Sequence, residues 1–338
     1  MAEQNRRIVL GSYPDGDIRL DDFRVETRPV PEPSAGGILV RNRWLSADPM
    51  LRIRIDRRPL GGKVPPMPLG AVIPGAAIGE VIASNNPDFQ VGALLEGRFG
   101  WQDYAVSRGE GVHKIAPGLS RPELALGPLG LPGFSAYVGL QVASGIAEGQ
   151  TLLVSGAAGA VGSVLGPLAK AAGLRVIGIA KGEEKGRYLI DVLGFDAVID
   201  RSDEPVSKAL ASLAPEGIDI YFDNVGGPML LDVMPHLKRL GQVLICGLMA
   251  QYGGAELSQP NAYTAFVQSI MNSTATVRAF ANTDYERLRP QFERDVGAMI
   301  ASGALPYRIH VMEGLEAAPK ALLTMFGDGV TGKLVVRV

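Results

Sequence analysis

The second half of the chain alternates between short apolar runs and longer segments whose apolar residues recur with helical spacing. Helical spacing is seen, for example, over 184–194 and 229–241. Strands joined by helical crossovers form a parallel sheet with helices on both faces. The pattern therefore predicts a doubly wound α/β domain with a six-stranded parallel sheet. The six predicted strands cover Thr151–Ser155, Arg175–Ala180, Ala197–Asp200, Ile218–Asn224, Gln242–Gly247 and Thr276–Ala281.

The first 125 residues are rich in proline and glycine and carry short β-type runs, such as "GGILVRNRWLS" (36–46) and "WQDYAVS" (101–107). Turn signals separate these runs at short intervals, which is typical of a compact, mostly-β domain. The tail over 304–338 ends on a further apolar run, and we expect it to return to the first domain. We therefore divide the chain into a β-rich domain (1–125), an α/β domain (126–301) and a C-terminal segment that completes the first domain (302–338).

A glycine-rich turn follows the first predicted strand of the α/β domain, in the stretch "TLLVSGAAGAVGSVLG" (151–166). The usual dinucleotide-binding pattern has three glycines, whereas this chain reads Ala157-x-Gly159-x-x-Gly162. Gly159 allows the backbone to approach a phosphate, and Gly162 allows the following helix to pack tightly on the strand. The helix amino terminus offers N–H groups to anionic oxygens. Because the turn lies between two strands of an α/β domain, we predict a dinucleotide site rather than a purely structural turn.

The end of the second predicted strand indicates which nicotinamide cofactor the turn would hold. Enzymes that use NAD place an Asp or Glu there, to bind the ribose 2′-hydroxyl. This strand ends in Ile-Ala-Lys-Gly over 179–182 with no acid at its tip, which favours the 2′-phosphate of NADP. The alternative is that the nearby charges are solvated helix-end residues, and Glu183 and Glu184 weaken the pattern. The basic residues near the tip are Lys181, Lys185, Arg187 and Arg201.

The amino-acid composition limits the kinds of molecule that the protein is expected to bind. The chain has 338 residues, 46% hydrophobic and 20% charged, which fits a globular protein of two domains. A net charge of −2 without strongly charged blocks argues against nucleic acid or a membrane surface as the main partner. The amino-terminal segment lacks the features of a signal peptide, and glycines and prolines interrupt the apolar stretch over 124–142. We expect a cytoplasmic protein with a small-molecule substrate.

Cysteine and histidine, the usual ligands of zinc, are scarce in this chain. The chain has one cysteine, Cys246, and three histidines, at 113, 236 and 310. These residues do not have the spacing of a zinc site. We therefore expect no metal.

Several segments together resemble one known family. They are "NRRIVL" (5–10), "LSADP" (45–49), "GWQDYAVS" (100–107), "PGFSAYVGL" (132–140), "FDNVGG" (222–227), "CGLMAQY" (246–252) and "GKLVVRV" (332–338). With the glycine turn, the chain resembles the zinc-free medium-chain dehydrogenase/reductases. It is most similar to the branch of prostaglandin reductases (leukotriene hydroxydehydrogenases) and bacterial curcumin-type enone reductases. The resemblance implies a GroES-like β-rich catalytic domain interrupted by a Rossmann domain, and a homodimer.

The resemblance also implies an activity and a set of site residues. The activity is NADPH-dependent reduction of a carbon–carbon double bond conjugated to a ketone or aldehyde, with hydride delivered to the β-carbon. Tyr252 is the implied hydrogen-bond donor to the enolate oxygen, together with the ribose hydroxyl of the cofactor. Met50 and Arg52 are implied at the substrate. The implied cofactor residues are Gly159, Ala160, Val161 and Gly162 at the pyrophosphate, Lys185 and Arg201 at the 2′-phosphate, and Asn224, Cys246, Gly247, Leu248, Tyr252 and Phe280 elsewhere along NADP(H).

The chain departs from the family pattern at three places, of which the change at Met50 affects the expected substrate more than the expected reaction. The family usually reads Tyr-Met-Arg where this chain has Met50-Leu51-Arg52, and Arg201 stands where a tyrosine is common. Relatives carry an asparagine where this chain reads Gly-Asp-Gly-Val over 327–330. Two alternatives stay open, an NADPH-dependent quinone oxidoreductase and an NADP-binding protein without catalysis.

Overall fold

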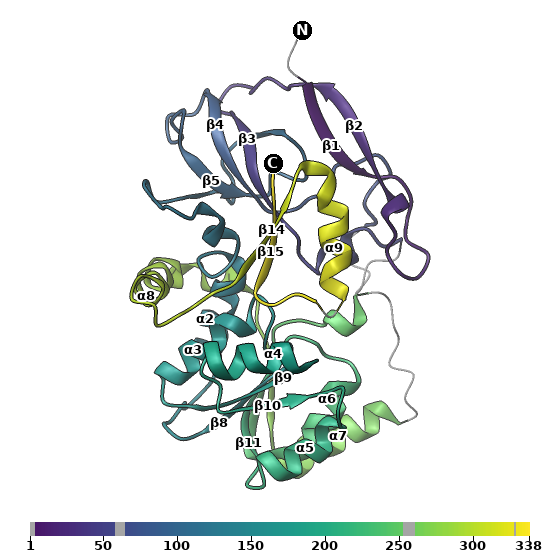
Figure 1. The fold of residues 1–338 in the computed structure, drawn as a ribbon, viewed down its shortest axis with the longest axis vertical. Coiled ribbons are helices and arrows are strands. Elements are labelled where there is room, and N and C mark those ends of the chain that lie inside the picture. Colours follow the sequence, from purple (N-terminus) through teal and green to yellow (C-terminus); the bar gives the residue numbers. More distant parts are fainter. Residues whose placement is uncertain (1–3, 58–64, 253–260, 328) are drawn as a thin grey trace. The chain divides into compact units, whose positions relative to one another are not determined.

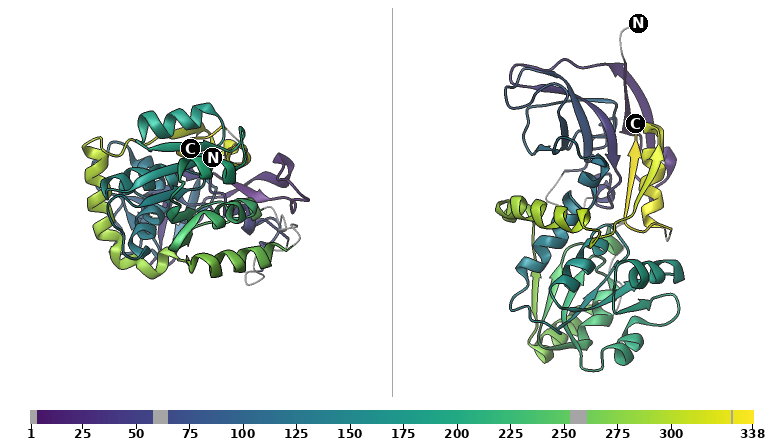
Figure 2. Two further views of the ribbon diagram at one scale, coloured as in Figure 1. Left: turned by 90° about the horizontal axis from the view of Figure 1, so that it is seen from below. Right: turned by 60° about the vertical axis from the view of Figure 1, so that its left-hand side comes forward.

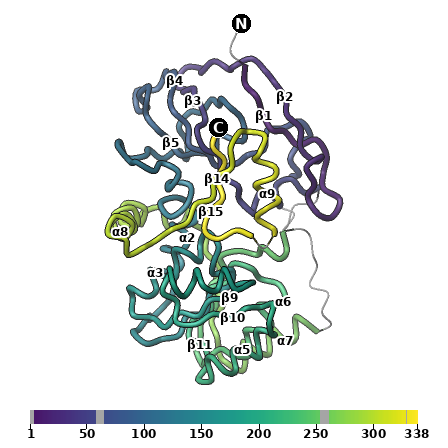
Figure 3. Tube along the Cα trace, viewed as in Figure 1, coloured from purple at the N-terminus to yellow at the C-terminus, as the bar shows by residue number. Residues whose placement is uncertain are grey.

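The computed structural model describes residues 4–57, 65–252, 261–327 and 329–338 of the chain (Figure 1). The chain folds into two compact units. The first contains the described residues up to Leu126, those from Ile309 onward, and Tyr252, and the second contains the rest between Gly127 and Arg308. Apart from Tyr252, the chain thus leaves the first unit after Leu126 and re-enters it at Ile309. Figure 3 traces the path of the backbone.

The second unit is built on a six-stranded parallel sheet in the order β10-β9-β8-β11-β12-β13. Numbered along the chain, this is the order 3-2-1-4-5-6 of the dinucleotide-binding doubly wound fold. The predicted α/β fold class is confirmed. The strands are β8 (Thr151–Val154), β9 (Arg175–Ala180), β10 (Ala197–Asp200), β11 (Ile218–Asp223), β12 (Leu237–Ile245) and β13 (Thr276–Ala279).

Successive residues of the central strands point to opposite faces, and both faces are buried under helices (Figures 1 and 2). Leu152 and Val154 pack among α2, α3 and α8, whereas Leu153 packs among α5, α6 and α7 on the other side. A strand buried on both faces is apolar throughout, which is why these strands are visible in the sequence. The helices of this unit are α2 (Leu131–Val142), α3 (Gly162–Ala171), α4 (Glu183–Arg187), η3 (Tyr188–Val192), α5 (Val206–Leu213), α6 (Pro228–Val233), η4 (Met234–His236), η5 (Met249–Gln251), α7 (Ala262–Ser273), η6 (Asn282–Leu288) and α8 (Arg289–Ala301).

One predicted helix is wrong in its second half. Residues 229–241 have helical spacing, but the helical part ends at His236 and strand β12 begins at Leu237. Pro235 has no N–H group to continue a helix, and Leu237 pairs with Ile218 at the start of β11. Leu240 then adopts a left-handed backbone, with φ 65°, and turns its side chain to solvent, where it is 72% exposed.

The first unit is built from β-sheets, so the predicted β-rich domain is confirmed. A seven-stranded sheet has the order β14-β15-β3-β4-β5-β7, with β6 also paired to β3, and β1 and β2 form a two-stranded antiparallel sheet. The strands are β1 (Gln4–Leu10), β2 (Phe23–Pro29), β3 (Ile38–Ser46), β4 (Ala77–Ser84), β5 (Leu94–Gly97), β6 (Tyr104–Ser107), β7 (His113–Lys114), β14 (Ile309–Glu313) and β15 (Lys333–Arg337). The helices are η1 (Leu20–Asp22), α1 (Leu51–Arg54), η2 (Pro122–Leu126), η7 (Leu315–Ala317) and α9 (Ala318–Phe326).

The C-terminal segment adds two strands to this sheet. β15 pairs parallel with β14 through the crossover helix α9, and antiparallel with β3, where Val335 lies opposite Ser46. The boundary between the two units lies between Arg308 and Ile309, later than the boundary at 301/302 predicted from the sequence. Residues 302–308 lie with the second unit because Leu305, 1% exposed, is part of its hydrophobic core. Among the described residues, no helix has the length and apolar character needed to cross a membrane.

Candidate cofactor and active site

The glycine turn connects β8 to α3, and its geometry depends on a glycine that the motif does not include. Gly156 is the residue with a left-handed backbone, at φ 57°, one position before the expected first glycine. Ala157 is fully buried, and its N–H donates to the carbonyl of Ile179 on the neighbouring strand at 3.1 Å. A Cβ at Gly162 would lie 2.4 Å from the Ala157 carbonyl oxygen, so helix and turn approach too closely for any side chain there. At Gly159 the nearest atom to such a Cβ is the Gly156 oxygen at 3.1 Å.

The amino terminus of α3 is suited to an anion. The helix starts at Gly162 with Val161 as its N-cap, and no side chain caps it. The first N–H groups of a helix point outward and carry partial positive charge. The hydroxyl of Tyr307 donates to the carbonyl of Ala160 at 3.1 Å and so fixes the turn. These residues fit a pyrophosphate, and neither Gly156 nor Tyr307 carries a sequence signal by which we would have found it.

The ends of β9 and β10 bring the predicted 2′-phosphate residues into one region. Lys181 follows β9, Lys185 lies in α4, and Arg201 follows β10 with its N–H bonded to the Ala180 carbonyl at 3.0 Å. The sequence placed no acid at the tip of β9, yet the neighbouring strand supplies Asp200, whose carboxylate accepts the N–H of Gly182 at 2.9 Å. Hydrogen bonds from the Ser202 side chain and from the backbone N–H groups of Gly182 and Ser202 lower the pKa of Asp200. Both carboxylate oxygens therefore bind the loops that follow β9 and β10.

A buried polar network lies where β8 and β11 end side by side. Asp223, fully buried, accepts the Ser155 hydroxyl at 2.7 Å and the Tyr221 hydroxyl at 2.9 Å. The same oxygen accepts the N–H groups of Val225 and Gly226 at 3.0 and 2.9 Å. The Asn224 side chain, predicted at the cofactor, donates to the Ser155 carbonyl at 2.8 Å. The carboxyl ends of β8 and β11 are thus joined through side chains.

The loop after β12 is tied to the same network. The N–H groups of Cys246 and Gly247 donate to the backbone carbonyl of Asp223 at 2.8 and 3.1 Å. Burial, and secondarily the charge of Asp223, raises the pKa of the Cys246 thiol to about 12. Leu248 follows in the same loop and is half-buried. Phe280 comes directly after β13 and packs against Phe222, with ring centroids 6.2 Å apart.

The remaining predicted residues, Tyr252, Met50 and Arg52, belong to the first unit. Tyr252 directly follows η5 and is half-buried, and the next described residue is Asn261. Met50 and Arg52 belong to the first unit, where Met50 is the N-cap of α1 and is 43% exposed. Arg52 is 3% exposed, and its guanidinium is engaged by the Asp56 carboxylate at 2.6 Å and the Gly16 carbonyl at 2.8 Å.

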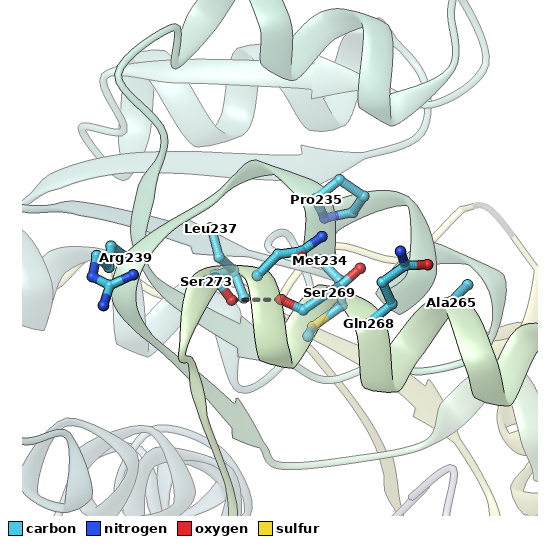
Figure 4. Close-up of a pocket in the computed structure, with 9 residues that line it drawn as sticks. Met234, Pro235, Leu237, Arg239, Ala265, Gln268, Ser269 and Ser273 are labelled. Carbon is cyan, nitrogen blue, oxygen red and sulfur yellow. Dashed lines mark hydrogen bonds between the residues drawn. The ribbon is translucent and has the colours of Figure 1, made fainter.

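A hollow of about 410 Å³ lies between α7 and the start of β12 and contains none of the predicted site residues (Figure 4). Its lining includes Met234, Leu237, Arg239 and Gln268. In the same wall, the Ser273 hydroxyl donates to the Ser269 carbonyl at 2.7 Å. β12 begins at Leu237, so this hollow is at the amino end of the strand, opposite the edge that carries the glycine turn. Among the residues that the structure describes, no group of three or more His, Cys, Asp or Glu side chains is arranged to hold a metal ion.

Comparison with known proteins accounts for almost the whole chain. A family model described as "N-terminal domain of oxidoreductase" matches residues 6–115, and one described as "Zinc-binding dehydrogenase" matches residues 160–291. The NADPH-dependent curcumin reductase of Escherichia coli is 36% identical, over 99% of this chain and 97% of its own. The chain belongs to the zinc-free medium-chain dehydrogenase/reductases.

Two further relatives place the chain in the branch that the sequence motifs indicate. Prostaglandin reductase 1 of Rattus norvegicus is 31% identical over 99% of both chains. The crystal structure of CurA from Vibrio vulnificus in complex with NADPH matches with a TM-score of 0.93 and 37% identity, over 98% of this chain and 99% of that one. The chain therefore lies in the prostaglandin and curcumin reductase branch of these medium-chain dehydrogenase/reductases.

Proposed function

We propose that this protein is an NADPH-dependent reductase of the carbon–carbon double bond in α,β-unsaturated ketones and aldehydes. The observation that carries the proposal is the turn between β8 and α3. Gly162 there has no room for a side chain, and an uncapped helix begins at that point. This is an NADP-dependent oxidoreductase of the medium-chain family, and its relatives include a curcumin reductase and a prostaglandin reductase.

Different residues of the second unit bind different parts of the cofactor. The N–H groups at the start of α3, around Gly159 to Gly162, hold the pyrophosphate. Lys185 and Arg201 bind the 2′-phosphate through charge-assisted hydrogen bonds. Because the adenosine end then lies over β9 and β10, the nicotinamide end lies across the switch point, over β11 and β12. Asn224 and the loop from Cys246 to Leu248 surround that end.

Bound NADPH supplies a hydride, two electrons and one proton, to the β-carbon of the substrate. The electrons of the double bond move onto the carbonyl, which becomes an enolate, and the α-carbon then takes a proton from water. The enolate oxygen needs a hydrogen-bond donor at the moment its charge develops. The Tyr252 hydroxyl fills this role, since a phenol with a pKa of about 10 is protonated at neutral pH and able to share its proton. Met50 and Arg52 are assigned to the substrate side.

The test is steady-state oxidation of NADPH with a simple enone and a simple quinone measured side by side. We expect turnover of the enone, with the saturated carbonyl compound as product, and a preference for NADPH over NADH. Turnover of the quinone alone would favour the quinone oxidoreductase. Tight binding of NADPH with neither acceptor reduced would favour a cofactor-binding protein without catalysis. The homodimer also remains a prediction, and light scattering that gives the monomer mass would contradict it.

A further inference from the structure

The carboxylate of Asp223 is bonded on one side only. Its Oδ1 accepts four hydrogen bonds, from Ser155, Tyr221, Val225 and Gly226, at 2.7 to 3.0 Å. Its Oδ2 is buried and has no hydrogen-bond partner among the residues that the structure describes. The side chain is 0% exposed. Such an arrangement is costly for a polar group, so the asymmetry calls for a functional reason.

The four donors on Oδ1 are those that a carboxylate anion accepts. Four donors converge on Oδ1, two of them hydroxyl groups and two backbone N–H groups, and such a set stabilises a carboxylate anion. A protonated acid would place its hydrogen on Oδ2, where no described residue offers an acceptor. Asp223 is therefore a buried negative charge, held in a fixed position by β8, β11 and the loop that follows β11.

Two neighbouring groups respond to this charge. Burial is the main cause that raises the pKa of the Tyr221 hydroxyl well above its usual value, and the Asp223 charge adds to it. The Cys246 thiol, in the loop after the next strand, has a raised pKa for the same two reasons in the same order. The field of Asp223 thus extends along the carboxyl edge of the sheet from β11 to the loop after β12. Solvent screens a buried charge only weakly.

The strand order indicates which part of the cofactor lies near the Asp223 charge. Asp223 ends β11, next to the switch point between β8 and β11, and the nicotinamide end of a dinucleotide lies on that side of the switch point. The nicotinamide ring is neutral in NADPH and carries one positive charge in NADP⁺, after the hydride has left. A nearby anion therefore distinguishes the two redox forms of the cofactor.

We propose that Asp223 is a positioning residue with an electrostatic function: it holds the loops after β8, β11 and β12 together, and its charge stabilises the oxidised nicotinamide ring. The effect favours departure of the hydride toward the substrate. The inference rests on the proposed function only in that the second unit binds NADP(H), and it does not depend on the identity of the acceptor.

The experiment measures binding and requires no turnover. Dissociation constants of NADP⁺ and NADPH are determined by titration calorimetry for the intact wild-type protein and for D223N. The amide of D223N keeps an oxygen for the four donors and removes the charge. We expect the ratio of the NADP⁺ constant to the NADPH constant to rise on the order of tenfold or more, as expected for the loss of one unit charge at several ångströms in a protein interior. If D223N weakens both forms equally, Asp223 is only structural and the proposal is overturned.

Asp219 provides a matched control on the same strand. It lies four residues before Asp223, about 13 Å further from the carboxyl edge at the usual rise of a strand. Its carboxylate pairs with Lys238 at 2.8 Å and accepts the N–H of Thr151 at 2.8 Å. D219N removes the same charge from the same strand, so its ratio should equal that of the wild type. An equal rise in D219N and D223N would show that position does not matter and would overturn the proposal.

A second variant covers the case in which D223N does not fold. N224D adds a carboxylate one residue further along the same loop and leaves Asp223 in place. We expect it to shift the ratio in the opposite direction, toward tighter NADP⁺. An unchanged ratio in folded N224D would mean that this edge does not face the nicotinamide, which overturns the proposal. If the wild type binds neither form, the proposed function itself has failed; if the wild type reduces an enone and only the ratios stay constant, this inference alone has failed.

Discussion

The guanidinium of Arg52 forms a 2.6 Å ion pair with the carboxylate of Asp56, one helical turn further along the chain, and both lie in the β-rich unit. The Arg52 side chain is only 4% exposed, and that of Asp56 is 22% exposed. A second donor group of Arg52 binds the Gly16 carbonyl. The charge of Arg52 thus connects α1 to a distant loop of the same unit.

This pair yields the first prediction. Replacing Arg52 by alanine removes a buried guanidinium from the half-buried Asp56 carboxylate and from the Gly16 carbonyl, and we expect a loss of about 2–4 kcal/mol in the free energy of unfolding. Urea denaturation of wild type and R52A measures it. The matched control is R54A, which removes a neighbouring arginine of α1 and should cost less than about 1 kcal/mol. Unchanged stability of R52A together with a large rise in KM for the enone would assign Arg52 to the substrate alone.

The second prediction distinguishes the roles of Gly159 and Gly162 in the glycine turn between β8 and α3. In G162A the new Cβ would lie 2.4 Å from the Ala157 carbonyl oxygen, so we expect about 1–3 kcal/mol of destabilisation. In G159A the nearest atom is 3.1 Å away, and we expect stability within about 1 kcal/mol of the wild type. The methyl group of G159A should still obstruct the phosphate and weaken NADPH binding. Thermal melts and NADPH titrations measure both, and wild-type affinity in G159A would remove Gly159 from the site.

The α/β unit shows which parts of the fold could be predicted from the sequence. Its strands were predictable because strands buried on both faces are apolar throughout, as Leu152, Leu153 and Val154 are. Residues 237–241 were misread because their spacing imitates a helix, although Pro235 marked its end. The motif spacing drew attention to Ala157, whereas the left-handed backbone belongs to Gly156. Backbone dihedral angles of this kind cannot be derived from spacing alone.

The surroundings of the site side chains could likewise not be predicted from the sequence. The sequence marks Asn224 through a resemblance, but the donors on Asp223 come from two separate segments, Ser155 and residues 221–226, which meet only in the fold. Arg52 was assigned to the substrate from its position in a motif, and its burial became evident only in the structure. Residues whose surroundings are assembled from distant segments are those that a linear reading describes least well.

The third prediction concerns cofactor choice. K185A should raise the KM for NADPH roughly ten- to a hundredfold, the usual value of a hydrogen bond to a charged group, and leave the KM for NADH nearly unchanged. The matched control is R187A, two residues along the same helix, where the arginine is 66% exposed and pairs with Glu183 at 3.7 Å. Equal effects of K185A on both cofactors would mean that the lysine serves another purpose. R201A should act in the same direction as K185A.

The fourth prediction concerns Tyr252. If Tyr252 donates to the enolate oxygen as proposed, Y252F removes that donor and should lower the turnover number on a simple enone at saturating NADPH. Loss of one oxyanion donor typically costs about 10²–10³-fold, and we expect a smaller loss because the ribose hydroxyl shares the task. Y263F, in which an 80% exposed tyrosine loses its hydroxyl, is the matched control. If folded Y252F turns over at the wild-type rate, Tyr252 has no part in the mechanism.

The fifth prediction follows from the single cysteine of the chain, Cys246. A pKa raised to about 12 keeps the thiol protonated, so alkylation by iodoacetamide at pH 8 should be at least about a hundredfold slower in the native protein than in urea. Because the folded-state pKa lies above the unfolded one, the thiol's contribution to stability is complete below about pH 9 and is lost as pH rises toward 12. C246S should show a weaker decline in melting temperature over that interval. Rapid native alkylation at pH 8 would contradict the burial.

The pairing of β15 with β3 has a consequence for biosynthesis. Ser46 of β3 pairs with Val335 of β15, which is synthesised about 290 residues later. At translation rates of about 5–20 residues per second, that interval is roughly 15–60 s. During this time β4 already pairs with one edge of β3, including Trp44 and Leu45, and β6 pairs with residues 38–41 on the other edge. The stretch Trp44–Ser46 still lacks β15 on that other edge. A nascent chain of this protein therefore carries an open strand edge while the inserted α/β unit is being made, and such an edge can pair with another chain.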